Sequence, residues 1–171
     1  MSKLKTYQAI DDPDLSQSEL RELYNYDPLT GQFKRRTTRA GVSINQKVGT
    51  VSGGYLRVSV NGKRHMAHRL AWLYMTGEWP KHTIDHINRN RLDNRWHNLR
   101  CLPFSENGQN QCGKGYSLNK KLGKYVAQIG VGGRQNRKTI YLGLFDDPKQ
   151  ARVAYLAAKA KHHPNYTGES Q

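Results

Sequence analysis

Four polar residues in the segment 83–110, TIDHINRNRLDNRWHNLRCLPFSENGQN, have types and spacing that can do chemistry. Asp85 and His86 are adjacent, Asn98 begins an Asn-Leu-Arg triplet, and Asn107 lies in a short polar stretch after it. Carboxylate and amide oxygens are hard ligands that suit Mg²⁺ or a similar cation. Histidine, with a usual pKa of about 6.5, is available as a base near neutral pH. The segment therefore predicts a cation bound by Asp85 and Asn107 beside a basic His86.

The first elements that must position these residues are a strand and a loop. Residues 83–87 predict a strand with β-branched residues at its start, and alternation along it puts Asp85 and His86 on opposite sides. The segment 88–97 is rich in Asn, Asp and Arg, which predicts a loop. Asn98 then has two candidate tasks, which are to hold this loop or to orient the ring of His86.

A second strand and a helix complete the predicted unit. The strand is expected at 99–102 and the helix at 106–111. Pro103 lies at or just before the helix start, and Ser105 is the candidate N-cap. We expect Asn107 to leave the first turn of this helix, across the first strand.

The positions Asp85-His86, Asn98 and Asn107 resemble those of the HNH nucleases. The likeness is to the subgroup of phage and intron homing endonucleases, in which the first metal-ligand His is an Asp and the last is an Asn. The resemblance implies metal-dependent cleavage of double-stranded DNA. Asp85 and Asn107 would bind one Mg²⁺ or Mn²⁺, His86 would be the general base, and Asn98 would be the structural Asn of the catalytic set. We also expect Arg100 to contact DNA. Many relatives carry two CxxC pairs for a structural zinc; this chain has none, so no zinc is expected.

Other interpretations of the same residues exist. Asp-His pairs occur by chance, and Asn-rich loops are common solvated turns, so the prediction depends on four positions in register within a basic chain. His97 is interpreted as a surface or DNA-contacting residue and not as a ligand. A competing class of function is a catalytically silent DNA-binding or inhibitor protein that retains the nuclease fold.

Composition favours a polyanionic partner. The chain has 171 residues with 28 Lys and Arg against 13 Asp and Glu, a net charge of +15. Residues 31–112 contain 14 basic and 4 acidic residues, and residues 113–166 contain 11 and 2. Two basic blocks suit nucleic acid, either as a nuclease or as a ribosome-associated protein. No apolar run approaches the roughly 18–20 residues of a membrane span, and no signal peptide is visible, so we expect a cytoplasmic protein. The resemblance to phage homing endonucleases implies a phage-type protein in a bacterial host cell. Cys101 and Cys112 have no metal-ligand spacing, and a disulfide is not expected.

Upstream elements are expected to support the site. Ser16 and Glu19 form a capping-box pair before a helix at 17–24. The run YDPLTGQFKRR resembles the N-terminal part of phage HNH proteins, where it leads into a small sheet. Asn61-Gly62 predicts a tight hairpin. The strands are expected at 32–36, 48–51, 55–60 and 63–66, and a helix at 67–75 ends at Gly77. His68 is interpreted as structural, because it lies inside this apolar helix, and His68-Arg69-Leu70 resembles a triplet found upstream of the nuclease motif.

The second basic block alternates with period two and resembles the ethylene-response-factor (APETALA-type) DNA-binding domain. The residues that carry the likeness include Gly123-Lys124-Tyr125, Tyr141-Leu142-Gly143 and Ala154-Tyr155. In that family a three-stranded sheet, covered by one helix, lies in the major groove. In this chain Ile140, Leu142 and Leu144 are expected to face the helix. The predicted DNA contacts of this block are Lys120, Lys121, Lys124, Gln128, Arg134, Arg137, Thr139 and Tyr141. The other interpretation is a small basic fold that binds phosphates only.

These expectations define an α+β fold with four parts. Residues 1–30 are an N-terminal segment with a short helix, and 31–111 are the HNH nuclease domain, a small sheet plus the ββα-metal unit 83–111. Residues 113–166 are a three-stranded antiparallel sheet with one packed helix, and 167–171 are a tail. No heptad repeat or long apolar helix face is present, so a monomer that nicks one strand of an asymmetric site is expected.

Overall fold

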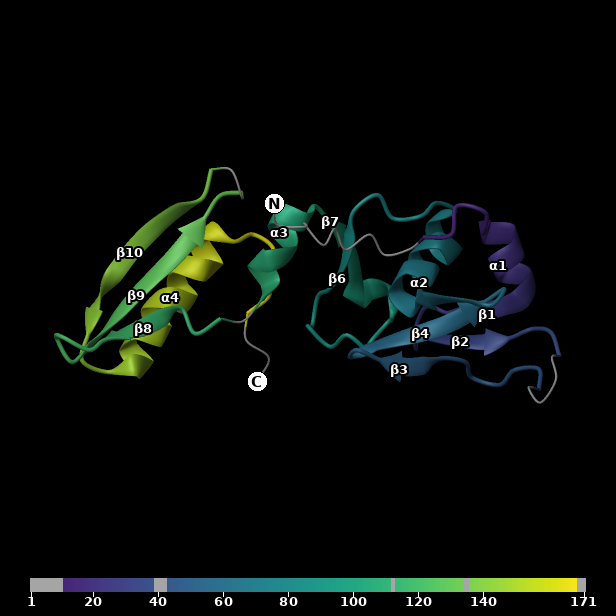
Figure 1. Ribbon diagram of the computed structural model, residues 1–171, viewed down its shortest axis with the longest axis horizontal. Helices are drawn as coiled ribbons and strands as arrows, with labels where there is room; N and C mark the ends of the chain where they lie inside the picture. Colours follow the sequence, from purple (N-terminus) through teal and green to yellow (C-terminus); the bar gives the residue numbers. More distant parts are fainter. Residues whose placement is uncertain (1–10, 39–42, 112, 134–135, 169–171) are drawn as a thin grey trace, which may run out of the picture. The chain divides into compact units, whose positions relative to one another are not determined.

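The computed structural model describes residues 11–38, 43–111, 113–133 and 136–168, apart from the side chain of Ser105. The chain forms two compact units, Met1–Cys101 and Leu102–Gln171 (Figure 1). This division falls inside the predicted nuclease domain 31–111, whose extent as a functional domain stays a prediction. Small sheets and short helices make up both units, which is compatible with the predicted α+β class. None of the helices in the described ranges is long and apolar enough to cross a membrane.

The first unit contains three small sheets and two helices. The pair β1–β2, the three-stranded sheet β3–β4–β5 and the pair β6–β7 are the sheets, and α1 and α2 are the helices. Their bounds are α1 Gln17–Leu23, β1 Tyr24–Asp27, β2 Gln32–Arg35, β3 Thr50–Ser52, β4 Tyr55–Val60, β5 Lys63–Met66, α2 Ala67–Thr76, β6 Thr83–His86, the 3₁₀ turn η1 Trp96–Asn98 and β7 Leu99–Leu102.

Local signals account for several of these boundaries. The Ser16 hydroxyl accepts a 3.2 Å hydrogen bond from the backbone N–H of Glu19 and so begins α1. Asn61 and Gly62 both have positive φ, at 49° and 81°, as a two-residue hairpin turn requires, and they join β4 to β5. Gly77, at φ 85°, ends α2 in the left-handed conformation. The hairpin turn and the end of α2 are confirmed as predicted. Of the predicted capping box, the structure shows the Ser16 half, while the Glu19 carboxylate accepts a hydrogen bond from Asn61 Nδ2.

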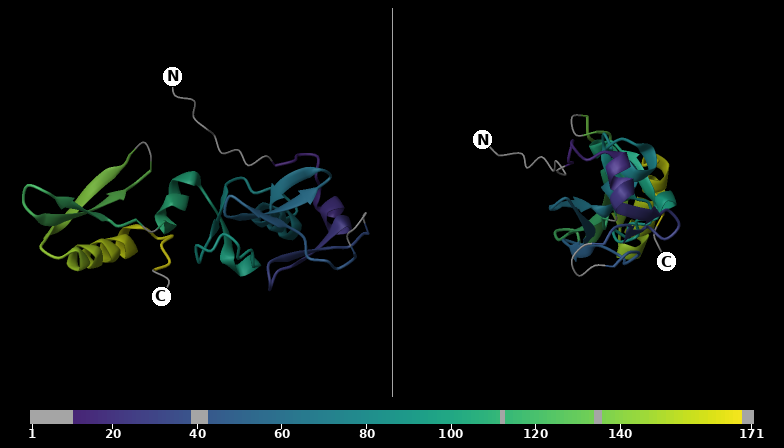
Figure 2. Two further views of the ribbon diagram at one scale, coloured as in Figure 1. Left: turned by 60° about the horizontal axis from the view of Figure 1, so that its bottom comes forward. Right: turned by 90° about the vertical axis from the view of Figure 1, so that its right-hand side faces the viewer.

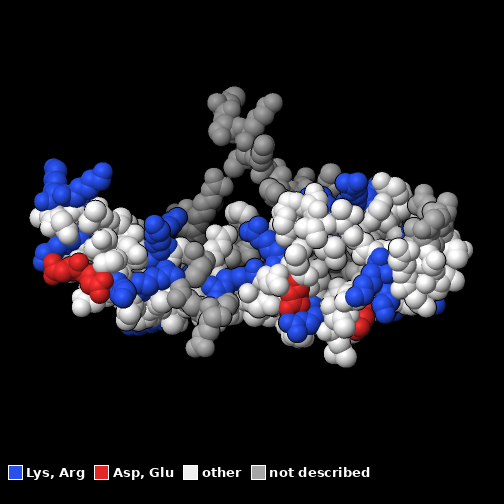
Figure 3. All heavy atoms as spheres, turned by 90° about the horizontal axis from the view of Figure 1, so that it is seen from below, with Lys and Arg blue, Asp and Glu red and all other residues white. Residues whose placement is uncertain are grey.

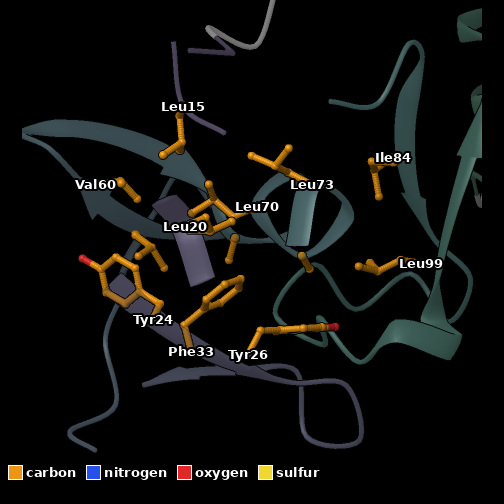
Figure 4. Close-up of a cluster of buried hydrophobic side chains, with 13 residues drawn as sticks. Leu15, Leu20, Tyr24, Tyr26, Phe33, Val60, Leu70, Leu73, Ile84 and Leu99 are labelled. Atoms are coloured by element: carbon orange, nitrogen blue, oxygen red, sulfur yellow. The ribbon is translucent and has the colours of Figure 1, made fainter. Parts of the chain in front are cut away.

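The core of the first unit brings both helices together with β1, β2, β4, β6 and β7 (Figure 4). Val58 and Val60 alternate inward from β4, while Arg57 and Ser59 point to the opposite face. Burying such side chains stabilises the fold by roughly 25 cal/mol per Å² of apolar surface removed from water. The fully or nearly fully buried apolar residues are Leu15, Leu20, Tyr24, Tyr26, Phe33, Val58, Val60, Ala67, Leu70, Ala71, Leu73, Ile84 and Leu99.

The second unit is a three-stranded antiparallel sheet with one long helix. Strand order is β10–β9–β8, and α4 lies along one face of the sheet (Figures 1 and 2). Asp147 caps α4 by accepting a 2.9 Å hydrogen bond from the backbone N–H of Lys149, and Pro148 occupies the first turn. The bounds are α3 Phe104–Asn107, the 3₁₀ turn η2 Gly108–Asn110, β8 Tyr116–Asn119, β9 Lys124–Val131, β10 Lys138–Phe145 and α4 Pro148–His162.

The C-terminal segment ties α3 and η2 into the second unit. The amide of Asn165 donates to the Glu106 carboxylate over 3.0 Å, and the Thr167 hydroxyl donates to Asn110 Oδ1 over 3.0 Å. Lys159, almost fully buried in α4, donates to the carbonyl of Gln111. These contacts within one unit explain why the chain divides at β7 and not at the predicted boundary near residue 112.

Several element predictions were wrong in detail. Helix α1 ends at Leu23, because Tyr24 begins β1, a strand that was not predicted. The helix after β7 begins at Phe104 with Pro103 as its N-cap, so Ser105 lies inside it and is not the cap. Leu144 does not face α4. A β-bulge between Tyr141 and Gly143 shifts the register, pairs Leu144 with Val126 and leaves Leu144 37% exposed.

Candidate active site

The hairpin β6–β7 separates Asp85 from His86. Burial alternates along β6, so that Ile84 and His86 are buried while Asp85 is only partly buried. At the end of the strand, the backbone N–H of Ile87 donates a 2.9 Å hydrogen bond to the carbonyl of Asn98. The predicted placement of Asp85 and His86 on opposite sides of the strand is confirmed.

Asn98 holds the loop that connects the two strands. Its Oδ1 accepts a 2.9 Å hydrogen bond from the backbone N–H of Asn88. Its Nδ2 donates to Asn88 Oδ1 over 3.0 Å and to the carbonyl of Asp93 over 2.7 Å. The side chain is 4% exposed, so these bonds form away from water. Of the two tasks predicted for Asn98, the structure places it in the first, as a tie across the loop.

Asn94 contacts the imidazole of His86 by a side-chain hydrogen bond. Asn94 Oδ1 lies 3.1 Å from His86 Nε2, and both side chains are buried. The Asn94 amide is oriented because its Nδ2 donates to the carbonyl of Leu92 over 3.3 Å. With Oδ1 turned to the ring as an acceptor, Nε2 must carry the proton in the neutral imidazole, and Nδ1 is the basic nitrogen. Asn94 therefore selects the tautomer of His86.

Tyr26 fixes the backbone at Asn94. Its hydroxyl donates a 2.7 Å hydrogen bond to the Asn94 carbonyl. Burial raises the pKa of Tyr26, so this hydroxyl keeps its proton near neutral pH. The tie connects β1 to the active-site loop and gives the unpredicted strand a role in positioning the site.

Two aromatic neighbours pack against His86 inside the unit. The rings of His68 and His86 meet edge to face with their centroids 5.1 Å apart. The centroid of the Tyr55 ring lies 6.4 Å from that of the His86 ring. Burial, with the nearby His86 and Arg69, lowers the pKa of His68 to about 3. Burial also lowers the pKa of His86, although its bond to Asn94 and the charges of Asp85 and Asp93 act in the opposite direction. Both rings are therefore neutral near pH 7, the state that a base requires.

Asp85 forms an ion pair with Arg100. Nε and Nη2 of Arg100 both donate to Asp85 Oδ2, over 2.9 and 2.8 Å. The Asp85 side chain is 13% exposed and the Arg100 side chain 22%. Arg91 belongs to the surroundings of His86 instead: its guanidinium lies 5.0 Å from the centre of the Tyr55 ring, and its charge acts to lower the pKa of His86. Asp85 is thus paired with one cation while Arg91 adds positive charge near His86, which suits a site that receives a phosphate.

The predicted cation ligands are compatible in kind with a hard metal ion. A carboxylate from Asp85 and an amide oxygen from Asn107 suit Mg²⁺, which keeps several water ligands of its own. Asn107 is the last residue of α3 and is partly buried. Among the residues that the structure describes, no group of three His, Cys, Asp or Glu side chains could hold a metal ion. The pairing of Asp85 with Asn107 on one ion stays a prediction.

The predicted DNA contacts in the second unit lie on the sheet face opposite α4 or on its turns. Gln128 pairs with Tyr141 across β9 and β10, and both are exposed, Tyr141 at 62%. Thr139 pairs with Gly130, over which the guanidinium of Arg137 lies, since a Cβ built on Gly130 would meet Arg137 Nε at 2.6 Å.

The remaining predicted contacts of this unit are lysines and one further arginine. Lys120 and Lys121 are exposed on the β8–β9 turn. Lys124 is partly buried and pairs with Asp146 over 3.1 Å. Arg134 lies outside the described residues. Lys and Arg are more prominent than Asp and Glu on the face of each unit seen in Figure 3.

Sequence reasoning missed Asn94 and the contacts that His68 and Tyr55 make with His86. Asn94 lies in a loop with four Asn residues between 88 and 98, and nothing in its local sequence distinguishes it from the others. His68 was recognised as an internal helix residue, and it is buried, but its edge-to-face contact with His86 depends on the packing of α2 against β6.

Comparison with known proteins supports a nuclease. Residues 65–109 match the HNH endonuclease family. No curated protein and no solved structure matches the chain. The matched segment contains Asp85, His86, Asn98 and Asn107, and the HNH domain implies DNA as the substrate. It ends before β8, so the resemblance of residues 113–166 to the ethylene-response-factor domain stays a prediction.

Proposed function

We propose that this chain is a metal-dependent HNH endonuclease that hydrolyses phosphodiester bonds in double-stranded DNA. The observation that supports it most is His86, a buried imidazole with a lowered pKa, whose Nε2 faces Asn94 and which follows Asp85 in β6. A neutral imidazole with one nitrogen occupied by an acceptor is prepared to take a proton at the other. The family match over residues 65–109 gives this arrangement its reaction class.

His86 is the general base in the proposed reaction. Nδ1 takes a proton from water while the water oxygen forms a bond to phosphorus and the bond to the 3′-oxygen breaks. The leaving oxygen takes a proton from solvent. Throughout the reaction, Nε2–H of His86 donates a hydrogen bond to Asn94 Oδ1, and this bond stabilises the imidazolium as it forms. The divalent ion, bound by Asp85 and Asn107, would offset negative charge on the phosphate and on the leaving oxygen.

Substrate binding is assigned to cations near the site and to the second unit. Arg100, held at Asp85, and Arg91, over Tyr55, would meet the phosphates beside the cleaved bond. The open face of β8–β9–β10 would read the DNA groove as in ethylene-response-factor domains, through Gln128 and Tyr141 among others. Two unlike basic units suit one long asymmetric site, so a monomeric homing-type enzyme that nicks one strand is the form that we propose.

Plasmid nicking tests the proposal. Supercoiled plasmid is incubated with the protein in Mg²⁺, in Mn²⁺ or in EDTA, and with the His86→Ala variant. We expect open circles to appear before any linear form, only with a divalent ion, and at a rate lowered about 100- to 10,000-fold in the variant. His82→Ala, at an exposed histidine of the same unit, is the matched control and should cut like the parent chain. An His86→Ala protein that retains more than a few per cent of the parent rate would contradict the assignment of the base.

One observation favours a second function, that of a DNA-binding or inhibitor protein without turnover. Two donors of Arg100 occupy Oδ2 of Asp85, one of the two predicted metal ligands. In such a protein the pair would be permanent, and DNA would bind equally well with and without divalent ions. Binding to a labelled duplex with no cleavage in Mg²⁺ or Mn²⁺, at protein in excess over plasmid, would favour this function over the nuclease.

A further inference from the structure

A hollow lined by three arginines lies on the first unit, on the outer face of the β3–β4–β5 sheet. Its volume is about 260 Å³. Arg57 of β4 pairs with Thr50 of β3, and Ser59 of β4 pairs with Arg64 of β5, so these four side chains share the face opposite the core. The residues that line it are Tyr24, Arg35, Val48, Gly49, Thr50, Ser52, Arg57, Ser59 and Arg64.

The charges in this hollow are uncompensated by nearby acids. None of its lining residues is Asp or Glu, and the ion pairs found among the described residues do not include Arg35, Arg57 or Arg64. Arg57 Nε is buried and has no hydrogen-bond partner among the residues that the structure describes. A buried donor without a partner is costly, and a bound anion would satisfy it.

Arg35 is already oriented toward the hollow. Its Nη2 donates to the Tyr24 hydroxyl over 3.2 Å, and its guanidinium lies 5.3 Å from the centre of the Tyr24 ring. The Tyr24 hydroxyl in turn donates to the carbonyl of Ser59 over 2.6 Å. Guanidinium groups offer paired donors that match phosphate oxygens, and hydroxyl groups add neutral donors. The lining therefore has the chemistry of a phosphate site.

We infer that this hollow binds a phosphodiester of the nucleic-acid backbone other than the one that is cut. The rim residues Thr50, Ser52, Ser59 and Arg64 are exposed, so a bound group stays open to the outside, as a continuous backbone requires. The inference rests on the proposed function only in taking DNA as the partner. It adds a contact on the N-terminal sheet to those on the nuclease loop and on the second unit.

Salt-dependent binding tests the inference without cleavage. A labelled duplex is titrated with the full chain in EDTA between 50 and 300 mM salt, and the logarithm of the association constant is plotted against the logarithm of salt concentration. Each phosphate contact contributes about 0.9 to the slope for duplex DNA. Arg64→Gln, at an exposed position, and the double variant Arg57→Gln/Arg64→Gln should each lower the slope by about 0.9, and equally for unrelated duplex sequences.

Lys63→Gln is the matched control, because it removes one charge next to Arg64 but from the opposite face, where Lys63 pairs with Asp12. It should leave the slope unchanged. Tryptophan fluorescence confirms folding of each variant. Equal slopes for the arginine variants and this control would overturn the inference. A second outcome would also overturn the inference. Inorganic phosphate would raise the melting temperature of the parent chain but not of the double variant, while the salt slope of DNA binding stayed the same in both. The hollow would then be a site for a free phosphate ligand. Absence of DNA binding by the parent chain would instead count against the proposed function.

Discussion

Lowering the pH from 7.5 to 5.0 should destabilise the first unit through His68. Its ring is 7% exposed, packs against His86 and has its pKa lowered to about 3 by burial. In the unfolded chain the same side chain titrates near 6.5. Below that pH the unfolded state binds a proton that the folded state rejects, so the free energy of unfolding falls as pH falls from about 6.5 toward 3.

The size of this effect follows from the two pKa values. One pKa unit corresponds to 1.36 kcal/mol. A pH of 5.0 lies about 1.5 units below the pKa of His68 in the unfolded chain, whereas His68 in the folded chain is still unprotonated at that pH. His68 alone should therefore cost about 2 kcal/mol of stability at pH 5.0. The pKa values of His86 and His65 are also lowered by burial, so both act in the same direction. Asp93, with a pKa of about 2, contributes only at lower pH.

Urea unfolding followed by tryptophan fluorescence measures this difference in the right place. The three tryptophans of the chain, Trp72, Trp79 and Trp96, all lie in the first unit. The free energy of unfolding is determined at pH 7.5 and 5.0 for the parent chain, for His68→Phe and for His68→Asn. Only the change between the two pH values is compared, so that any loss of packing common to both conditions cancels.

Both variants should show a pH-dependent loss about 2 kcal/mol smaller than the parent chain. His97→Gln, at an exposed histidine in the same unit, is the control and should keep the full loss. If the parent chain loses no stability by pH 5.0, or if the His68 variants lose as much as the control, then His68 is not held neutral by burial and the argument is wrong.

Three further outcomes are expected. Asn94→Ala should lower the cleavage rate about 10- to 100-fold with DNA affinity unchanged, and Asn94→Asp should move the acid limb of the pH–rate profile to higher pH, because a carboxylate favours the imidazolium. The double variant Asp85→Ala/Asn107→Ala, assayed for cleavage at several Mg²⁺ concentrations, should raise the activation free energy by much less than the sum of the increases in the two single variants. Full additivity would show that the two residues do not share an ion. Gln128→Ala with Tyr141→Ala should reduce preference between duplex sequences more than it reduces affinity, and an unchanged preference in competition binding would remove the sheet face as the reader.

Local patterns predicted those parts of the fold that local physics decides. The Asn61-Gly62 hairpin and the end of α2 at Gly77 follow from turn chemistry and from the left-handed conformation that glycine adopts easily. Tyr24–Asp27 escaped prediction because Asn25 and Asp27 are poor strand formers, and the strand depends on its pairing with β2 and on burial of two tyrosines.

The remaining errors have tertiary causes. The bulge after Tyr141 moves Leu144 to the open face, and a bulge adds one residue that strict alternation cannot anticipate. Ser105 looked like a cap, but the helix begins one residue before it, after Pro103. The hollow was invisible because Arg35, Arg57 and Arg64 come from three strands, and only strand register brings them together.

The charges around His86 explain why burial decides its protonation state. Asp85 and Asp93 both favour the imidazolium, yet each carboxylate already has a guanidinium partner, Arg100 and Arg95 respectively. Because each acid is compensated locally, its attraction for a proton on His86 is weakened, and the cost of burying an imidazolium outweighs the remaining attraction. A neutral imidazole at His86 thus follows from two carboxylates that are each paired with a guanidinium, and this is the protonation state that the proposed general base requires.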